Sequence, residues 1–434
     1  MRRLLIGTMV LGVVLGVGGA PAFGAASGSG ATDVGVTKDE IRIAVVADVD
    51  NPFKPGLFKG AVNGVNAAVK QINATGGVAG RKLKVDFIDS KVNAAETRNA
   101  IITACEQDFA LVGTAAAFLT SVEDETGCKD KAGQATGLPD LASFVTGVQQ
   151  CSPVAYPVNP SLLDCATKDE HPQTYFGSSG TSKWYRSQIK GDAHGLYIAS
   201  NDSATGQRAQ DLLYEFPQKL GMKSDQHAYV SSSAPQSVYT PIVQKLKADG
   251  SNFAYAQGGD GLIALRQEAE LQGVHPDSVM WLCNSCYDKK LPSAGEVVDG
   301  TYQGLGFLPF EEASTNQNLR TLVKNVGSGT LDQFAVYGFA ATLLFKQAAE
   351  AAVKQHGPDG LTRANLLAEL AKIKSFDAGG MIGTSDIGDR RFGPCYMVMQ
   401  IDSGKWKRVF PKKAGTFDCD PKNLTSVKVD QPTG

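Results

Sequence analysis

The sequence lacks the short motifs by which common catalytic sites are recognised. It contains no G-x-S-x-G nucleophile turn, no Walker phosphate loop, no H-E-x-x-H zinc helix and no G-x-G-x-x-G strand-to-helix turn. Its five histidines lie near prolines, glycines or predicted strand ends, with no nucleophile beside them in the sequence. We therefore expect a protein that is not an enzyme, with no catalytic residue, no metal and no cofactor.

Long apolar runs and clusters of basic residues are also scarce. Beyond the N-terminus, no stretch approaches the roughly 18 uninterrupted apolar residues of a membrane span. The 42 basic and 44 acidic side chains give a formal charge of −2, whereas nucleic-acid binding needs concentrated positive charge. These features exclude an integral membrane protein and argue against a nucleic-acid partner.

The first 26 residues have the pattern of a secretory signal peptide. A basic start at residues 1–3 precedes the uncharged apolar stretch 4–19 and the small residues around positions 20–26. Cleavage after Ala22 and cleavage after Ala26 both fit this pattern. Because the segment contains no cysteine, we expect no lipid anchor. The sequence thus predicts an exported, soluble protein, periplasmic or extracellular, that begins with a flexible tether at residues 27–34.

All eight cysteines follow the predicted signal peptide. An even number in an exported protein is typical of disulfides, although eight cysteines allow about a hundred connectivities. The histidines show no zinc-like spacing from a cysteine pair. Cys283 and Cys286 also form a C-x-x-C motif, which leaves a redox protein open as an alternative. We predict pairing between sequence neighbours: Cys105 with Cys128, Cys151 with Cys165, Cys283 with Cys286, and Cys395 with Cys419.

Two blocks of alternating strand and helix patterns organise the chain, one over residues 41–112 and one over 196–271. β-branched runs alternate with stretches whose apolar residues recur every three or four positions. Such alternation predicts an α/β fold with two doubly wound lobes, each with a parallel sheet covered on both faces. Between the blocks, residues 147–172 are expected to be an ordered excursion. The C-terminal part is mostly helical and ends in a predicted hairpin at 396–410.

Several stretches together resemble one family of transport proteins. They are GVTKDEIRI at 35–43, INATGGVAGRK at 72–82, NDSATG at 201–206, and GDRR at 388–391 with the hairpin after it. Over residues 35–410 the chain is similar to the leucine/isoleucine/valine-binding type of ABC-transporter solute-binding proteins, which have the type I periplasmic binding fold. The resemblance implies a monomer that captures a small organic ligand between two lobes and presents it to an ABC permease.

The resemblance also implies a hinge of three crossover segments. We expect these near residues 173–177, near 305–310 and within the C-terminal hairpin region. The first lobe would then comprise residues 35–174 and 309–395, and the second would comprise 175–308 and 396–434. Hinge closure would let the ligand contact both lobes at once.

Ligands in open α/β sheets bind beyond the carboxyl ends of the strands, so the loops after the strands are the candidate site. Polar or aromatic residues in these loops lie beside glycine or alanine, which allow close approach to the backbone. The predicted ligand-binding residues are Phe53, Phe118, Leu119, Ser143, Phe144, Thr205, Gln257, Asp260, Asn284 and Tyr287.

The candidate site departs from the amino-acid-binding members of the family. Where those members have a serine for the ligand carboxylate, this chain reads AAAFL at residues 115–119. Where they have an acidic residue for the ligand amine, it has Asn284, whose neutral amide supplies no charge. We therefore predict a ligand less polar than a free amino acid, such as an apolar or aromatic organic acid or an amide, unless Asp260 supplies the charge. An exported sensor of the same fold and a hydrolase remain alternatives.

Overall fold

The computed structural model describes residues 30–51, 54–160, 162–202 and 204–430, so the predicted signal peptide lies outside the described residues. Its first sheet is parallel, with the strand order β2-β1-β3-β4. The central strands are almost fully buried, as expected for a sheet covered on both faces. The strands are β1 (Glu40–Ala47), β2 (Lys82–Asp89), β3 (Ala110–Val112) and β4 (Asp140–Leu141).

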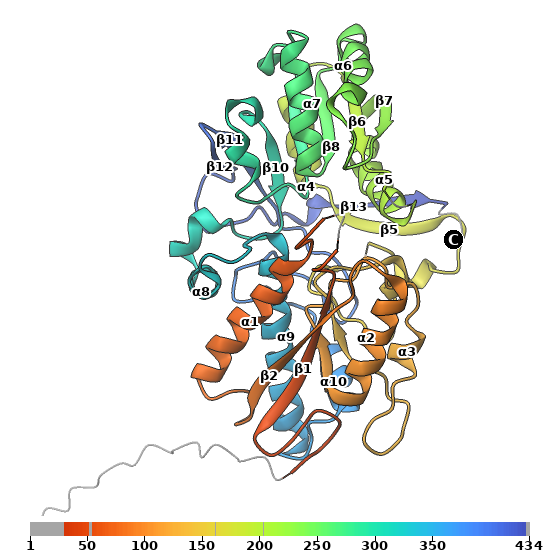
Figure 1. Cartoon of the computed structure of the whole chain (residues 1–434), viewed down its shortest axis with the longest axis vertical. Helices are drawn as coiled ribbons and strands as arrows, with labels where there is room; N and C mark the ends of the chain where they lie inside the picture. The colour runs from red at the N-terminus through yellow and green to blue at the C-terminus, as the bar shows by residue number, and fades with distance from the viewer. Residues whose placement is uncertain (1–29, 52–53, 161, 203, 431–434) are drawn as a thin grey trace, which may run out of the picture.

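Six helices surround this sheet, and we call the whole unit lobe 1 (Figure 1). They are α1 (Lys59–Ala74), α2 (Ala94–Gln107), α3 (Glu123–Thr126), α8 (Gln317–Val326), α9 (Gln333–His356) and α10 (Arg363–Leu370). Helices α1 and α9 touch through their backbones: a Cβ on Gly64 would lie 2.1 Å from the carbonyl oxygen of Ala335, and one on Gly338 would lie 2.3 Å from that of Ala61. Small residues on both helices thus permit this close packing.

The second sheet has seven strands in the order β12-β11-β10-β9-β8-β6-β7. Strands β6 to β10 are parallel, and β11 and β12 form an antiparallel hairpin at the edge, as the sequence predicts. The strands are β6 (Ala193–Ala199), β7 (Met222–Tyr229), β8 (Phe253–Gln257), β9 (Met280–Asn284), β10 (Tyr302–Leu305), β11 (Met397–Asp402) and β12 (Lys405–Phe410).

With four helices this sheet forms a unit that we call lobe 2. The helices are α4 (Gly180–Gln188), α5 (Ala204–Lys219), α6 (Tyr239–Ala248) and α7 (Gly259–Leu271). The predicted fold class, an α/β protein with two doubly wound parallel sheets, is therefore confirmed. In the described part of the chain, no helix combines the length and apolar character needed to cross a bilayer.

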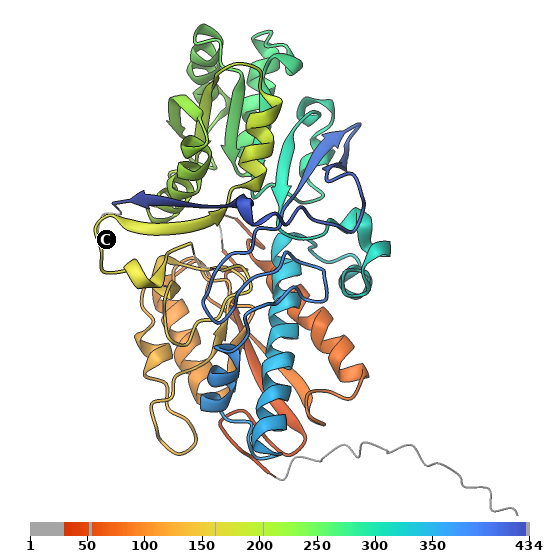
Figure 2. The same ribbon diagram turned by 180° about the vertical axis from the view of Figure 1, so that it is seen from behind.

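A two-stranded antiparallel ribbon that the sequence did not predict runs between the lobes (Figures 1 and 2). It pairs β5 (Gln173–Ser178) with β13 (Leu424–Val429) near the other end of the chain. The chain passes between the lobes three times: between β4 and β6, between β10 and α8, and between α10 and β11.

The structure contains four disulfides, and they join the neighbouring pairs Cys105–Cys128, Cys151–Cys165, Cys283–Cys286 and Cys395–Cys419. The second bond closes the irregular excursion between β4 and β5. Cys283 and Cys286 are 2% and 3% exposed, which leaves this C-x-x-C pair without the access that a redox site needs.

Arg363, at the start of α10, is fully buried and organises the base of lobe 1. Its guanidinium donates hydrogen bonds to carbonyl oxygens in the segments that the Cys105–Cys128 bond joins, and its backbone N–H donates to Asp33 at 2.7 Å. The planar fork of arginine satisfies several acceptors that one ammonium cannot reach. The acceptors are the carbonyl oxygens of Cys105 (2.8 Å), Asp108 (2.5 Å), Phe109 (3.2 Å) and Lys129 (2.7 Å).

We expect Arg363→Lys to lower the free energy of unfolding by about 3 kcal/mol or more, because it leaves several buried carbonyls unpaired. Denaturant unfolding with the disulfides intact measures this loss. Arg98→Lys is the matched control, since the Arg98 side chain is 69% exposed in its ion pair with Asp124, and exposed pairs contribute about 1 kcal/mol or less. Equal losses in the two variants would contradict the role given to Arg363.

Asp108, the residue after α2, is buried and lies beside Asp86 of β2, whose side chain is 26% exposed. Arg42 lies between them, 2.6 Å from a carboxylate oxygen of Asp86 and 3.8 Å from one of Asp108. Burial, together with the neighbouring Asp86, raises the pKa of Asp108 to about 7, against the lowering influence of Arg42 and Arg363. The folded protein therefore binds a proton here that the unfolded chain releases at lower pH.

Because the pKa is raised on folding, this stabilisation is complete below the unfolded pKa of about 4 and is lost as the pH rises through about 7. We expect the free energy of unfolding to fall between pH 5 and pH 7, with Asp108→Asn reducing the slope by up to about 1.4 kcal/mol per pH unit. Unfolding at several pH values tests this. Asp277→Asn, at a side chain 92% exposed, should leave the slope unchanged.

Candidate ligand-binding site

A buried carboxylate, Asp48, holds together the loops at the carboxyl edge of the lobe 1 sheet. It follows β1 directly and is 0% exposed. One oxygen accepts hydrogen bonds from the Ser90 hydroxyl at 2.6 Å and the Val92 N–H at 2.7 Å, and the other accepts from the Ala117 N–H at 2.8 Å. The loops after β1, β2 and β3 are thus fixed to one another.

Three phenylalanine rings form an aromatic cluster at this edge of lobe 1. Phe58 lies at the start of α1, Phe334 lies in the first turn of α9, and Phe144 follows β4. The ring of Phe58 lies 5.0 Å from that of Phe144 and 4.7 Å from that of Phe334, measured between centroids. Phe58 is buried, while Phe144 and Phe334 are half-buried and leave apolar surface accessible.

Asp332 lies beside the aromatic cluster and caps α9, accepting a hydrogen bond from the Ala335 N–H at 3.0 Å. A Cβ on Gly60 would lie 1.9 Å from its carboxylate, so glycine at the start of α1 makes room for it. Burial raises the pKa of Asp332 to about 6, with Asp288 raising it further and Lys54 lowering it. Because Asp288 belongs to lobe 2, Asp332 lies where the two lobes approach.

On lobe 2, Gln257 and Asn284 end the neighbouring strands β8 and β9 and lie in register. The Asn284 amide donates to the side-chain oxygen of Gln257 at 2.9 Å. Within the described part of the chain, the buried Gln257 Nε2 has no hydrogen-bond partner. Buried donors are normally paired, and this unpaired donor lies at the carboxyl ends of β8 and β9.

Asp260, at the start of α7, faces lobe 1. Its carboxylate lies 3.9 Å from the ammonium of Lys54, in the loop after β1. Both side chains are mainly exposed, at 72% and 63%. The pair thus joins the edges of the two lobes but is solvated.

The remaining predicted residues divide into several environments. The Ser143 hydroxyl is buried and donates to the carbonyl oxygens of Gly113 or Thr114, at 3.0 and 3.2 Å. Leu119 packs in a lobe 1 core cluster with α2 residues, and Phe118 is 36% exposed in a hollow beside α2.

Tyr287 is 2% exposed, and its hydroxyl donates to Glu311 at 2.5 Å and accepts from the Phe310 N–H at 2.7 Å. Its ring packs against Trp406, far along the sequence. Thr205 lies in the first turn of α5, and Phe53 lies outside the described residues.

The structure thus places Phe144 at the carboxyl edge of the lobe 1 sheet and Gln257, Asp260 and Asn284 at that of the lobe 2 sheet, whereas Tyr287 and Leu119 lie in packed interiors. Sequence reasoning missed Phe58, Phe334 and Asp332. One sequence signal could have found two of them. Asp332 precedes a long helical stretch, as is typical of an N-cap, and this places Phe334 in the first turn of that helix.

The profile of the periplasmic binding protein family matches residues 40–405. The fold also matches solved structures. A fatty acid ABC transporter substrate-binding protein from Thermomonospora curvata has a TM-score of 0.66 and 16% identity, over 88% of this chain and 97% of that one. The branched-chain amino acid transporter substrate-binding protein LivJ from Streptococcus pneumoniae, in complex with isoleucine, has a TM-score of 0.64 and 16% identity, over 86% and 99% of the chains.

An ABC transporter substrate-binding protein from Aeropyrum pernix has a TM-score of 0.66 and 16% identity, over 88% of this chain and 96% of that one. Comparison with curated protein sequences gives no match. The profile covers most of the chain, and the sheets and helices have the arrangement of the type I periplasmic binding fold. The chain belongs to the periplasmic binding protein family.

Proposed function

We propose that this protein is exported and captures a small organic molecule between lobes 1 and 2 for an ABC permease, without chemical conversion of the ligand. The observation that carries the proposal is that each lobe has a cluster of suitable side chains at the carboxyl edge of its sheet, and we call these clusters the two half-sites. Lobe 1 offers the aromatic cluster with Asp332, and lobe 2 offers the Gln257–Asn284 pair. A ligand that contacts both would favour the closed arrangement through its differential affinity.

The half-sites favour a ligand with an apolar portion and a hydrogen-bond acceptor. Phe144 and Phe334 present half-buried rings to the apolar portion, and the Nε2 of Gln257 supplies an unpaired donor. A carboxylate or amide oxygen fits that donor. Two of the similar structures are described by a fatty acid and by isoleucine. Both molecules join an apolar chain to a carboxylate, which supports a ligand of that chemical class for this protein.

The boundaries of the moving parts follow from the three connections. We assign residues 35–174 and 309–395 to one moving part and residues 175–308 and 396–434 to the other. The N-terminal residues 1–26 are the proposed export signal. Ser143, Leu119 and Tyr287 then support the loops of the site through packing and internal hydrogen bonds.

Native mass spectrometry of freshly purified protein tests ligand capture. We expect a co-purified small molecule, which unfolding of the protein releases unchanged. Added back at 100 times its dissociation constant, it should stabilise the protein by about 2.7 kcal/mol. A ligand that emerges chemically altered after incubation would contradict the proposal of capture without conversion.

Substitutions at the two half-sites test the location of the site. We expect Phe144→Ala and Asn284→Ala each to weaken binding of the co-purified molecule by about tenfold or more, because each removes roughly 1.4 kcal/mol of contact. Isothermal titration calorimetry measures the affinity. Asn66→Ala, at an exposed amide on α1, is the control and should leave the affinity unchanged.

Phe118→Ala distinguishes the junction of the lobes from the hollow beside α2, where Phe118 lies. If Phe118→Ala weakens binding while Phe144→Ala does not, the ligand occupies that hollow and the proposed location is wrong.

A further inference from the structure

Beyond β12, the chain continues as a segment at residues 411–430 that contacts all three connections between the lobes. We call this segment the C-terminal strap. The match to the family profile ends at residue 405, so the strap lies beyond the part of the chain that the family profile describes. In Figures 1 and 2 it lies at the level where the two lobes meet.

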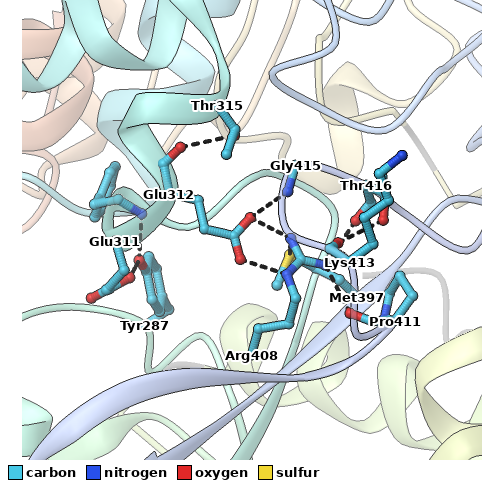
Figure 3. Close-up of polar contacts among 11 residues, drawn as sticks. Tyr287, Glu311, Glu312, Thr315, Met397, Arg408, Pro411, Lys413, Gly415 and Thr416 are labelled. Carbon is cyan, nitrogen blue, oxygen red and sulfur yellow. Dashed lines mark hydrogen bonds and ion pairs between the residues drawn. The ribbon is translucent and has the colours of Figure 1, made fainter.

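The connection between β10 and α8 is held through Glu312, in the short 3-10 helix Phe310–Thr315. Arg408 of β12 donates to both Glu312 oxygens, at 2.5 and 2.6 Å, and the N–H of Gly415 in the strap donates to one of them at 2.7 Å (Figure 3). Arg408 also donates to the carbonyl oxygen of Thr416 at 2.8 Å. The Arg408 and Glu312 side chains are only 6% and 11% exposed, so water competes little with this bidentate pair.

The connection between β4 and β6 is held by β13, which pairs with β5 along its whole length. Just beyond β5, the Ser179 N–H donates to the carbonyl oxygen of Asn423 at 2.7 Å, and its hydroxyl lies 2.9 Å from that of Thr425. Apolar side chains cover this ribbon: Tyr175, Leu212, Phe216 and Val427 form one buried cluster.

The connection between α10 and β11 is held covalently. Cys395 is bonded to Cys419 of the strap. Next to this bond, Tyr396 and Asp418 exchange backbone hydrogen bonds of 3.0 and 2.9 Å. The Asn423 amide donates to the carbonyl oxygen of Pro394 at 3.2 Å.

We propose that the C-terminal strap fixes the three connections to one another and so limits how far the lobes can open. Three independent segments would let the lobes twist and separate in several directions. Bonded into one unit, they leave rotation about a single hinge. The consequence for ligand capture rests on the proposed function, whereas the extent of opening can be measured without any ligand.

Small-angle X-ray scattering of the ligand-free full chain tests the strap. Glu312→Gln removes the charge that holds Arg408 and Gly415, and we expect a larger radius of gyration than for the unaltered protein. Amides in residues 306–316 should also exchange with deuterium about tenfold faster. Asp402→Asn is the matched control, because it also removes one acidic charge. Asp402 lies in the β11–β12 hairpin that carries Arg408, but it pairs with Lys407 in an exposed position, so this substitution should change neither the radius of gyration nor the exchange rate.

The double substitution Cys395→Ser with Cys419→Ser breaks the strap at a second, separate point and should cause the same expansion. If both variants keep the circular dichroism of the folded protein and the radius of gyration of the unaltered one, the proposal is overturned. Should one variant fail to fold, the same measurement on the other decides. Failure to find a bound small molecule would contradict the proposed function and leave this result standing.

Discussion

The candidate site depends on one buried carboxylate at the end of one strand. Asp48 accepts hydrogen bonds from Ser90, Val92 and Ala117, so three loops share a single anchor. Loops of this kind are otherwise the mobile parts of an α/β fold. The Phe58 N–H donates to the Asp48 carbonyl oxygen at 3.0 Å, and the Phe144 N–H donates to that of Thr114 in the loop after β3 at 3.1 Å. Both rings are therefore held at the edge of the sheet, so a ligand would not have to order them on binding.

The two sides of the proposed site differ in chemistry. Lobe 1 contributes mainly aromatic surface, and lobe 2 contributes the amides of Gln257 and Asn284. In the proposed site, an apolar ligand fragment would contact lobe 1, and a ligand acceptor would pair with the Gln257 donor. Burial of an unpaired polar group costs free energy. This asymmetry makes closure sensitive to whether the ligand carries that acceptor.

Local patterns were sufficient to predict most of the fold and part of the site. The apolar periodicity of α1, the alanine-rich run of α9 and the β-branched run of β1 come from neighbouring residues. The ribbon of β5 and β13 was missed because it depends on pairing between distant segments, such as Gly177 with Thr425. Tyr287 was predicted at the site from its loop position, yet Trp406 and Phe310 enclose its ring, and no local pattern reports such long-range packing.

The strong interactions lie within the lobes and at their connections, while the contact between the lobe edges is weak. Arg363 and the Cys105–Cys128 bond consolidate lobe 1, and the strap consolidates the connections. By contrast, Lys54 and Asp260 form an exposed pair at 3.9 Å, and such pairs contribute little. A binding protein whose lobes held each other tightly would stay closed without ligand. Under the proposed function, rigid lobes and a weak ion pair at their edges would leave the balance between open and closed states to the ligand.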